Sequence, residues 1–383
     1  MRIAVKDNIC MKHTTTQAAS LVLKGYKSPI QSTIVDLLYK YNTKNDFKHV
    51  NMDEFGMGSM GIHSMYGLAL LNGRVCGGSS SGSAQSVALK ECELGIGTDT
   101  GGSIRLPAAF CKIYGFKPSY GRVSRYGVIP YAQSLDTVGL LANTMDILTA
   151  AFKVLDKYDE KDATSLPIQY RQDTVVNKDK LIIGLPSHIK DPLFIQQIQL
   201  LKKNNKIEFI NVDLKLFKYH LACYYIIACA EASSSLNRYT GLLYPPTSNP
   251  NKLDFEELRL LNRQLFGNEV KSRLALGDFV LSSKEYGEWF LQATRTRRLI
   301  KNEFDSIFKS VDYLLMPTTL QDPPLLSDII EDASIYNTDE FTVGISLSGN
   351  PCLSFPTSTI SMQLIGNYLS DYQLLNDFNT INT

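Results

Sequence analysis

The chain has 383 residues, and 44% of them are hydrophobic, which is enough to bury a sizeable core in one large domain or two medium ones. The 39 lysine and arginine residues balance 38 aspartate and glutamate residues, so the net charge of +1 gives little attraction to nucleic-acid phosphates or an anionic membrane. No apolar run approaches the roughly 18 residues needed to cross a bilayer. We therefore expect no membrane insertion and no direct nucleic-acid binding by this chain alone.

Strand-like and helix-like apolar patterns alternate along the chain. In chain order, strands are expected over 2–8, 93–99, 180–186, 206–214, 312–318 and 361–366, and helices within 28–42 and 285–311. This mixture favours an α/β protein with helices covering a sheet. The polar segment 157–180 and the proline-rich segment 244–252 predict surface loops rather than domain linkers.

The seven cysteines show no C-x-x-C spacing, and their odd number fits neither a zinc site nor a disulfide framework. We expect reduced, mostly buried thiols and no metal site. The opening residues "MRIAVKDNIC" read as a strand and contain an acidic residue, so no targeting segment is expected there.

Two glycine-serine clusters stand out, "GGSSSGS" at 77–83 and "GTDTGGSIRLPA" at 97–108. A phosphate-binding loop is disfavoured because the dipeptide Gly-Lys occurs nowhere in the chain. Residues 78–82 match G-x-S-x-G, the nucleophile elbow of α/β-hydrolases, centred on Ser80. That mechanism needs a catalytic histidine downstream, and neither His188 nor His220 lies in a context that suggests catalysis.

Serine chemistry without histidine can use lysine as the base. Lys6, in the strand-like "IAVKDN", is the candidate. A lysine with the reference pKa of about 10.4 is almost entirely protonated near neutral pH, but burial lowers that pKa and makes the amine a usable base. A lysine at a strand end is, on its own, more often a solvated residue.

These segments together resemble the amidase signature family. The stretch "GGSSSGSAQSVA" followed by "GTDTGGSIRLPAAFCKIYGFKPSYGRVSRYG" is similar to its signature, and "AVKDN" to the strand that carries its catalytic lysine. The resemblance implies that Ser103 is the nucleophile, that Ser79 follows a cis peptide bond and relays the proton, and that Lys6 is the base. It also implies an oxyanion site at the backbone of Thr100, Gly101 and Gly102.

The resemblance implies the amidase-signature fold: one domain over residues 1–383, with a central twisted mixed β-sheet covered by helices on both faces. Two departures from the family pattern are visible. Ser81 replaces a glycine that is usual in the first cluster, and the helical segment that normally precedes the lysine strand is missing.

Within the family, later segments resemble the A-subunit branch of the glutamyl-tRNA(Gln) amidotransferases, among them "CYYIIACAEASSSLNRYTG", "FGNEVKSRLALGDFVLSS" and "DEFTVGISLSGNPCLSFP". This resemblance implies that Arg273 grips the α-carboxylate of glutamine, that Asp339 holds its α-amino group, and that Tyr224 is an aromatic substrate-site residue. Asp53 and Glu54 invite a metal interpretation, but a structural role is favoured because the family uses no metal.

The resulting hypothesis is a glutamine-hydrolysing subunit that releases ammonia by a Ser-Ser-Lys mechanism, so that a partner converts Glu-tRNA(Gln) to Gln-tRNA(Gln). No cofactor is expected in this chain, whereas ATP and Mg are expected at a B-type partner subunit, which would also make most tRNA contacts. A small third subunit is a further candidate partner. The resemblance to fungal mitochondrial forms favours the mitochondrial matrix, with the cytoplasm as the alternative. A free-standing amidase of small or acyl amides and a catalytically silent scaffold are the competing hypotheses.

Overall fold

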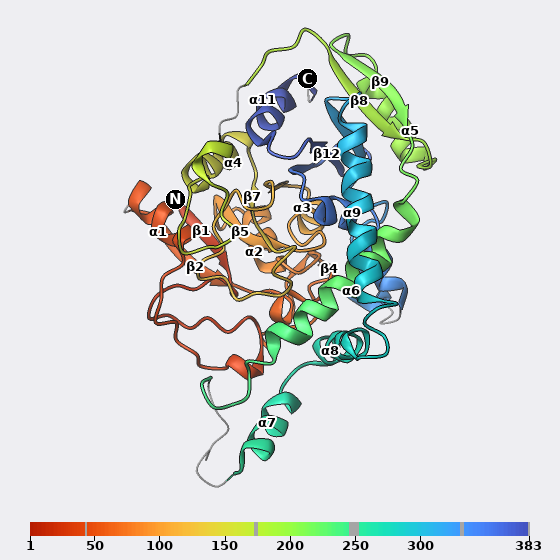
Figure 1. The fold of residues 1–383 in the computed structure, drawn as a ribbon. Coiled ribbons are helices and arrows are strands. Elements are labelled where there is room, and N and C mark those ends of the chain that lie inside the picture. The colour runs from red at the N-terminus through yellow and green to blue at the C-terminus, as the bar shows by residue number, and fades with distance from the viewer. Residues whose placement is uncertain (43, 172–174, 245–252, 330–332, 382–383) are drawn as a thin grey trace.

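A ten-stranded mixed sheet forms the centre of the computed structural model (Figure 1). The structure describes residues 1–42, 44–171, 175–244, 253–329 and 333–381. The strands follow the order β2-β1-β5-β7-β6-β11-β12-β10-β8-β9. Their bounds are β1 Arg2–Lys6, β2 Asp46–Val50, β5 Leu94–Asp99, β6 Tyr114–Lys117, β7 Thr137–Ala142, β8 Leu181–Pro186, β9 Ile207–Val212, β10 Tyr313–Pro317, β11 Cys352–Phe355 and β12 Met362–Gly366.

The sheet combines parallel and antiparallel pairs. Strand β1 runs parallel to both β2 and β5, and β8 runs parallel to β9 and β10. The middle strands from β5 through β7, β6, β11 and β12 to β10 are joined antiparallel. All six strand regions expected from the sequence form strands of this sheet, and the mixed α/β fold is confirmed.

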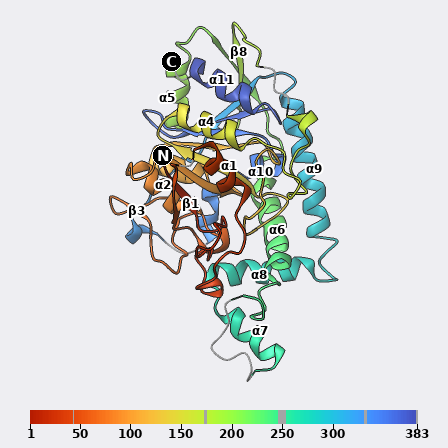
Figure 2. The same ribbon diagram turned by 90° about the vertical axis from the view of Figure 1, so that its left-hand side faces the viewer.

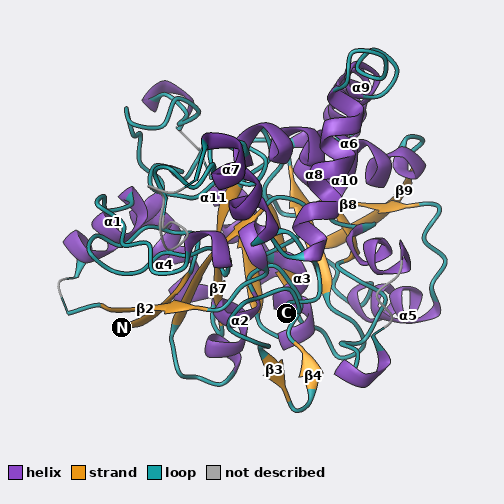
Figure 3. Cartoon of the chain, turned by 90° about the horizontal axis from the view of Figure 1, so that it is seen from below, coloured by secondary structure: helices purple, strands orange, loops and turns teal. Residues whose placement is uncertain are grey.

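Helices cover both faces of the sheet, as Figure 3 shows from below. Their bounds are α1 Thr33–Tyr41, α2 Ser81–Ala88, α3 Arg105–Cys111, α4 Met145–Leu155, α5 Pro192–Leu201, α6 Phe217–Leu236, α7 Phe255–Gln264, α8 Asn268–Leu281, α9 Phe290–Ile307, α10 Val343–Ser348 and α11 Asp371–Ile381. A separate hairpin pairs β3 Leu70–Leu71 with β4 Arg74–Val75. The two expected helical regions contain α1 and α9.

Side-chain alternation on β7 shows how the two faces differ. Leu141 packs into the cluster that contains side chains of α2 and α3, whereas Leu140 and Ala142 belong to the larger core that contains those of α4. Successive residues of one strand therefore hold helices on opposite faces.

The helices α8 and α9 both pack against α6 beside the sheet, and α7 projects away from the rest in both Figure 1 and Figure 2. Of the expected surface loops, 157–180 is irregular apart from one short 3-10 turn at Ile168–Tyr170, with 172–174 outside the described residues. Of the segment 244–252, residues 245–252 lie outside the described part of the chain. All seven cysteines are buried and free, as expected.

Candidate active site

Lys6 lies at the carboxyl end of β1 and contacts Ser79. Its Nζ donates to Ser79 Oγ at 2.7 Å and to Thr98 Oγ1 at 2.9 Å. The three residues meet because β1 and β5 are parallel neighbours, so that their carboxyl ends lie at one edge of the sheet, where the segment leading into α2 also passes. The Lys6 side chain is completely buried.

Burial lowers the pKa of Lys6 to about 7, although the carboxylates of Asp53, Asp136 and Asp99 partly oppose the shift. Desolvation penalises the charged amine, and the Coulomb attraction of the carboxylates recovers only part of that penalty. A substantial fraction of Lys6 is therefore neutral near pH 7, which is the form that can accept a proton.

The peptide bond between Gly78 and Ser79 is cis. Asp53 packs directly against it: a Cβ on Gly78 would lie 1.9 Å from Asp53 Oδ2, so only glycine fits. The Asp53 carboxylate accepts hydrogen bonds from the backbone N–H groups of Gly61 at 3.0 Å and His63 at 2.9 Å. Asp53 thus shapes the segment that presents Ser79.

Glu54 has different partners from its neighbour Asp53. Its carboxylate accepts from the hydroxyl of Ser20 and from the backbone N–H of Gly267, the latter at 2.8 Å. The two carboxylates therefore serve separate structural contacts. Among the described residues, no group of three or more His, Cys, Asp or Glu side chains is arranged to hold a metal ion.

Ser103 lies in the turn between β5 and α3, the turn that also contains the predicted oxyanion residues. Its side chain is 8% exposed and makes no hydrogen bond within the described part of the chain. Two contacts fix the turn from either end. Arg105 forms a buried ion pair with Asp99 across it, with Nη2 to Oδ1 at 2.8 Å, and Thr100 Oγ1 donates to Asp136 Oδ1 at 2.7 Å.

The glycines of this turn allow close packing. A Cβ on Gly101 would lie 2.5 Å from the phenol of Tyr224, and one on Gly102 would lie 2.4 Å from Thr342 Oγ1. Any larger residue at either position would push the turn away from α6 and α10. Tyr224 is therefore placed directly against the predicted oxyanion segment.

Arg273, from α8, lies in an aromatic enclosure. Its Nη1 donates to Tyr131 OH and its Nε to Glu269 Oε1, both at 2.7 Å. Its guanidinium carbon is 5.1 to 5.7 Å from the ring centres of Tyr131, Tyr225 and Tyr336. These contacts use two of the five guanidinium N–H groups, which leaves donors on Nη1 and Nη2 that can bind a carboxylate.

Asp339 lies close to this enclosure and is also buried. Its Oδ2 accepts from Ser59 Oγ at 2.6 Å and from Tyr225 OH at 2.8 Å. Burial raises the pKa of Asp339, against the lowering effect of these hydrogen bonds and of Arg273. Tyr225 therefore touches both predicted substrate residues, with its ring facing Arg273 and its hydroxyl bound to Asp339.

Tyr131 joins the two halves of the site. Its hydroxyl accepts from Arg273 Nη1, and Tyr224, whose side chain interacts with that hydroxyl, packs on Gly101. On its other side, Gly56 fills the space between Tyr131 and Ser79, since a Cβ there would lie 3.9 Å from Tyr131 Cβ and 3.7 Å from Ser79 Oγ. The contacts of Tyr131 thus connect Arg273 and Tyr224 with the surroundings of Ser79.

Several residues of this site were not identified from the sequence. They are Thr98, Tyr131, Asp136, Tyr225 and Glu269. A partial signal existed for Glu269, which stands four residues before Arg273 on the same helix, a spacing at which side chains pair. The alternative nucleophile Ser80 is fully buried, and its hydroxyl donates to the Thr98 carbonyl at 3.3 Å, which is a structural contact.

Comparison with known proteins gives a consistent result. The model of the amidase family matches residues 1–375. The chain is 40% identical to the A subunit of the mitochondrial glutamyl-tRNA(Gln) amidotransferase of Candida albicans, over 96% of this chain and 88% of that protein. It is also 40% identical to the A subunit of glutamyl-tRNA(Gln) amidotransferase from the bacterium Legionella pneumophila, over 97% of this chain and 81% of that protein.

Solved structures agree with the sequence comparison. The crystal structure of the A subunit of glutamyl-tRNA(Gln) amidotransferase from Thermotoga maritima superposes with a TM-score of 0.78 and 29% identity, covering 98% of this chain and 81% of that one. Allophanate hydrolase from Kluyveromyces lactis superposes with a TM-score of 0.80 and 26% identity, covering 100% of this chain and 61% of that one. The same fold therefore occurs in proteins with different names.

Proposed function

This chain belongs to the amidase family, and from that membership we propose that it hydrolyses the side-chain amide of glutamine as the A subunit of a glutamyl-tRNA(Gln) amidotransferase. The observation that carries the proposal is the burial of Arg273 and Asp339 beside the segment of Ser103. A free amino acid presents one anion and one cation, and both must be paired when they are buried. The names of the relatives support the same assignment.

In the proposed mechanism, Ser103 Oγ attacks the side-chain carbonyl carbon of glutamine. Its proton passes to Ser79, and the proton of Ser79 passes to neutral Lys6, which already lies 2.7 Å from Ser79 Oγ. Backbone N–H groups of the turn at 100–103 stabilise the oxyanion. Lys6 then returns the proton through Ser79 to the leaving nitrogen, so ammonia departs and a glutamyl ester remains on Ser103.

Water completes the cycle. The same lysine and serine relay removes a proton from a water molecule, which attacks the ester carbonyl carbon. The bond to Ser103 Oγ breaks, Ser103 recovers its proton, and glutamate is released. Asp339 holds the α-amino group and Arg273 the α-carboxylate through both steps.

We further propose that the ammonia passes to a B-type partner subunit that binds ATP, Mg and most of the tRNA, and that no cofactor is held in this chain. A mitochondrial location is the proposal favoured by the fungal relatives, with a cytoplasmic one as the alternative given the bacterial relatives. No helix among the described residues is long and apolar enough to span a membrane.

Replacing Arg273 with alanine in the assembled complex is expected to lower kcat/KM for glutamine by roughly 100-fold, because a charge-assisted hydrogen-bonded pair is worth about 3 kcal/mol. Ammonia release measures the effect. Lys271, exposed on the same helix, provides the matched control, and Lys271→Ala is expected to behave as wild type.

The same experiment separates the alternatives. Hydrolysis of a simple aliphatic amide, which has no α-carboxylate, is expected to be unaffected by Arg273→Ala. Glutamine hydrolysis that is indifferent to Arg273 would instead favour a free-standing amidase, and a complex without glutamine hydrolysis would favour a silent scaffold.

A further inference from the structure

Residues 131–136 form a short loop that contacts both halves of the candidate site. At its start, Tyr131 OH accepts from Arg273. At its end, Asp136 accepts from Thr100 Oγ1 and from the backbone N–H groups of Tyr131 and Ala132. A displacement of this loop would therefore disturb the contacts of Arg273 and of Thr100 together.

The middle of the loop is fixed from outside the site. The backbone N–H of Ser134 donates to Glu231 Oε2 of α6 at 2.8 Å. Arg297 of α9 donates from Nη1 to Ser134 Oγ at 2.6 Å and from Nη2 to Ser134 O at 2.8 Å. The position of Ser134 is thus set by side chains that do not touch the catalytic groups.

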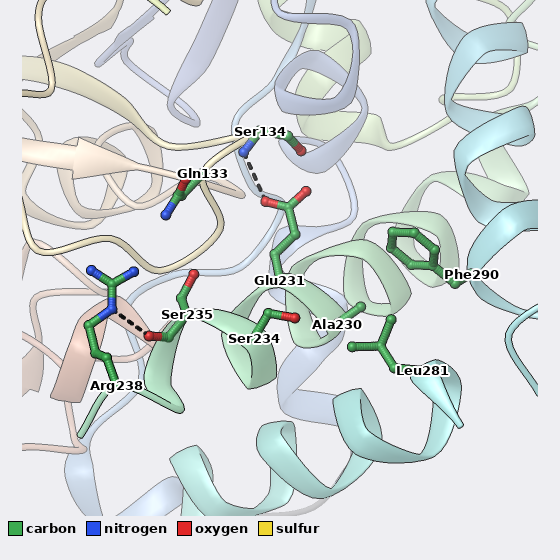
Figure 4. A pocket seen from close by; sticks show the side chains of 9 residues that line it. All are labelled: Gln133, Ser134, Ala230, Glu231, Ser234, Ser235, Arg238, Leu281 and Phe290. Carbon is green, nitrogen blue, oxygen red and sulfur yellow. Dashed lines mark hydrogen bonds between the residues drawn. The ribbon is translucent and has the colours of Figure 1, made fainter. Parts of the chain in front are cut away.

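A cavity of about 390 Å³ opens at this point (Figure 4). Figure 4 shows Glu231 reaching from α6 to Ser134, with Gln133 beside it, Arg238 farther along the chain, and Leu281 and Phe290 on the other side. The lining residues are Gln133, Ser134, Ala230, Glu231, Ser234, Ser235, Arg238, Leu281 and Phe290.

The cavity contains polar groups that are still free to bind. Within the described part of the chain, Glu231 Oε1 accepts no hydrogen bond, although the charge of Arg297 partly balances that of Glu231, and the Ser234 hydroxyl makes none. Arg238 uses only Nε, which donates to the Ser235 carbonyl at 2.8 Å. The free carboxylate oxygen and the terminal guanidinium nitrogens can bind groups of opposite charge on an incoming chain.

An exposed aromatic surface adjoins the cavity. Phe290, which lines it, packs against Tyr286 with ring centres 5.4 Å apart, and Trp289 packs against Phe279 at 6.4 Å. Phe279 is 49% exposed, Tyr286 40% and Trp289 44%, and Trp289 is the only tryptophan in the chain. Clustered exposed aromatic residues are enriched at protein interfaces.

We propose that this cavity and the adjoining aromatic surface form a docking site for a segment of the partner subunit, which places a basic side chain against Glu231 and acts on the amidase site through residues 131–136. This inference rests on the proposed function, since it requires a partner that uses the ammonia. A cation at Glu231 shares the carboxylate with the Ser134 N–H, so docking changes the contact that positions the loop.

The test compares two tryptophan substitutions on α6, in the chain mixed with its B-type partner. Ser234→Trp fills the cavity without removing the Glu231–Ser134 hydrogen bond, and Ala222→Trp places the same bulk at an exposed position of the same helix outside the cavity. Ser234→Trp is expected to weaken association at least tenfold and to abolish any increase in glutamine hydrolysis caused by the partner. Ala222→Trp is expected to change neither.

A second pair of variants tests the connection through the loop. Glu231→Gln retains an acceptor for the Ser134 N–H but loses the charge, so it is expected to keep the wild-type KM for glutamine and to respond less to the partner. Glu231→Ala loses both the acceptor and the charge, so it is also expected to raise KM for glutamine. KM for a simple aliphatic amide is expected to stay unchanged.

Association and partner response of Ser234→Trp equal to those of wild type would overturn the proposed docking site. A KM unchanged in Glu231→Ala would overturn the connection through the loop. Both results differ from failure of the proposed function, which would appear as glutamine hydrolysis that persists in the complex when Ser103 is replaced.

Discussion

Replacing Ser103 with alanine is expected to reduce glutamine hydrolysis by the assembled complex by roughly 10⁴-fold or more, because the covalent route is lost and only binding and oxyanion stabilisation remain. Ammonia release measures the loss. The effect should fall on kcat, since Ser103 is not one of the residues proposed to hold the α-amino and α-carboxylate groups of glutamine.

Ser80→Ala is the matched control for this prediction. Ser80 lies in the G-x-S-x-G stretch, but its buried hydroxyl donates to the Thr98 carbonyl. Its loss is expected to cost about 1 kcal/mol of stability and to preserve activity. The opposite pattern, in which Ser80→Ala is inactive and Ser103→Ala active, would assign the nucleophile to the hydrolase-like elbow.

Replacing Lys6 with arginine is expected to lower kcat by about 10³-fold, because arginine remains protonated at every accessible pH and cannot act as the base. The wild-type rate should depend on pH for the same reason. The pKa of Lys6 is lowered to about 7, and the neutral amine is the active form, so kcat/KM should rise as the pH increases through about 7 and level off above it.

Lys117 gives a control for the loss of a buried lysine. Burial lowers its pKa to about 8, but its Nζ donates to the Pro118 carbonyl, away from Ser79. Lys117→Met is expected to change the free energy of unfolding and to leave the midpoint of the pH dependence of kcat/KM unchanged. A pH profile that is flat between 6 and 8 in the wild type would contradict the role given to Lys6.

The sequence predicted the strands whose apolar runs are bounded by turn residues, such as β5 and β8, and missed short or ambiguous ones. β7 is a continuous apolar run that fits a buried helix as well as a strand, and β6 has only four residues, one of them glycine. Their placement depends on neighbours in the sheet that lie far away in sequence.

The residues of the candidate site likewise fall into those that the local sequence indicates and those that it does not. Lys6, Ser79 and Ser103 could be proposed from the sequence because each stands in a local motif that resembles one of the family's motifs. Tyr131 was not, because its partner Arg273 is 142 residues away and nothing in its own neighbourhood marks it. Tyr225 stands beside Tyr224, which the sequence did indicate. Only the packing of α6 shows that Tyr225 touches both Arg273 and Asp339.

Mass spectrometry of the complex after rapid acid quenching during glutamine turnover detects the proposed glutamyl ester directly. A fraction of the chain is expected to be heavier by one glutamyl group, with the added mass on the peptide that contains Ser103 and absent from Ser103→Ala. An adduct on a cysteine peptide, or one that persists in Ser103→Ala, would contradict the assignment of Ser103 as the nucleophile.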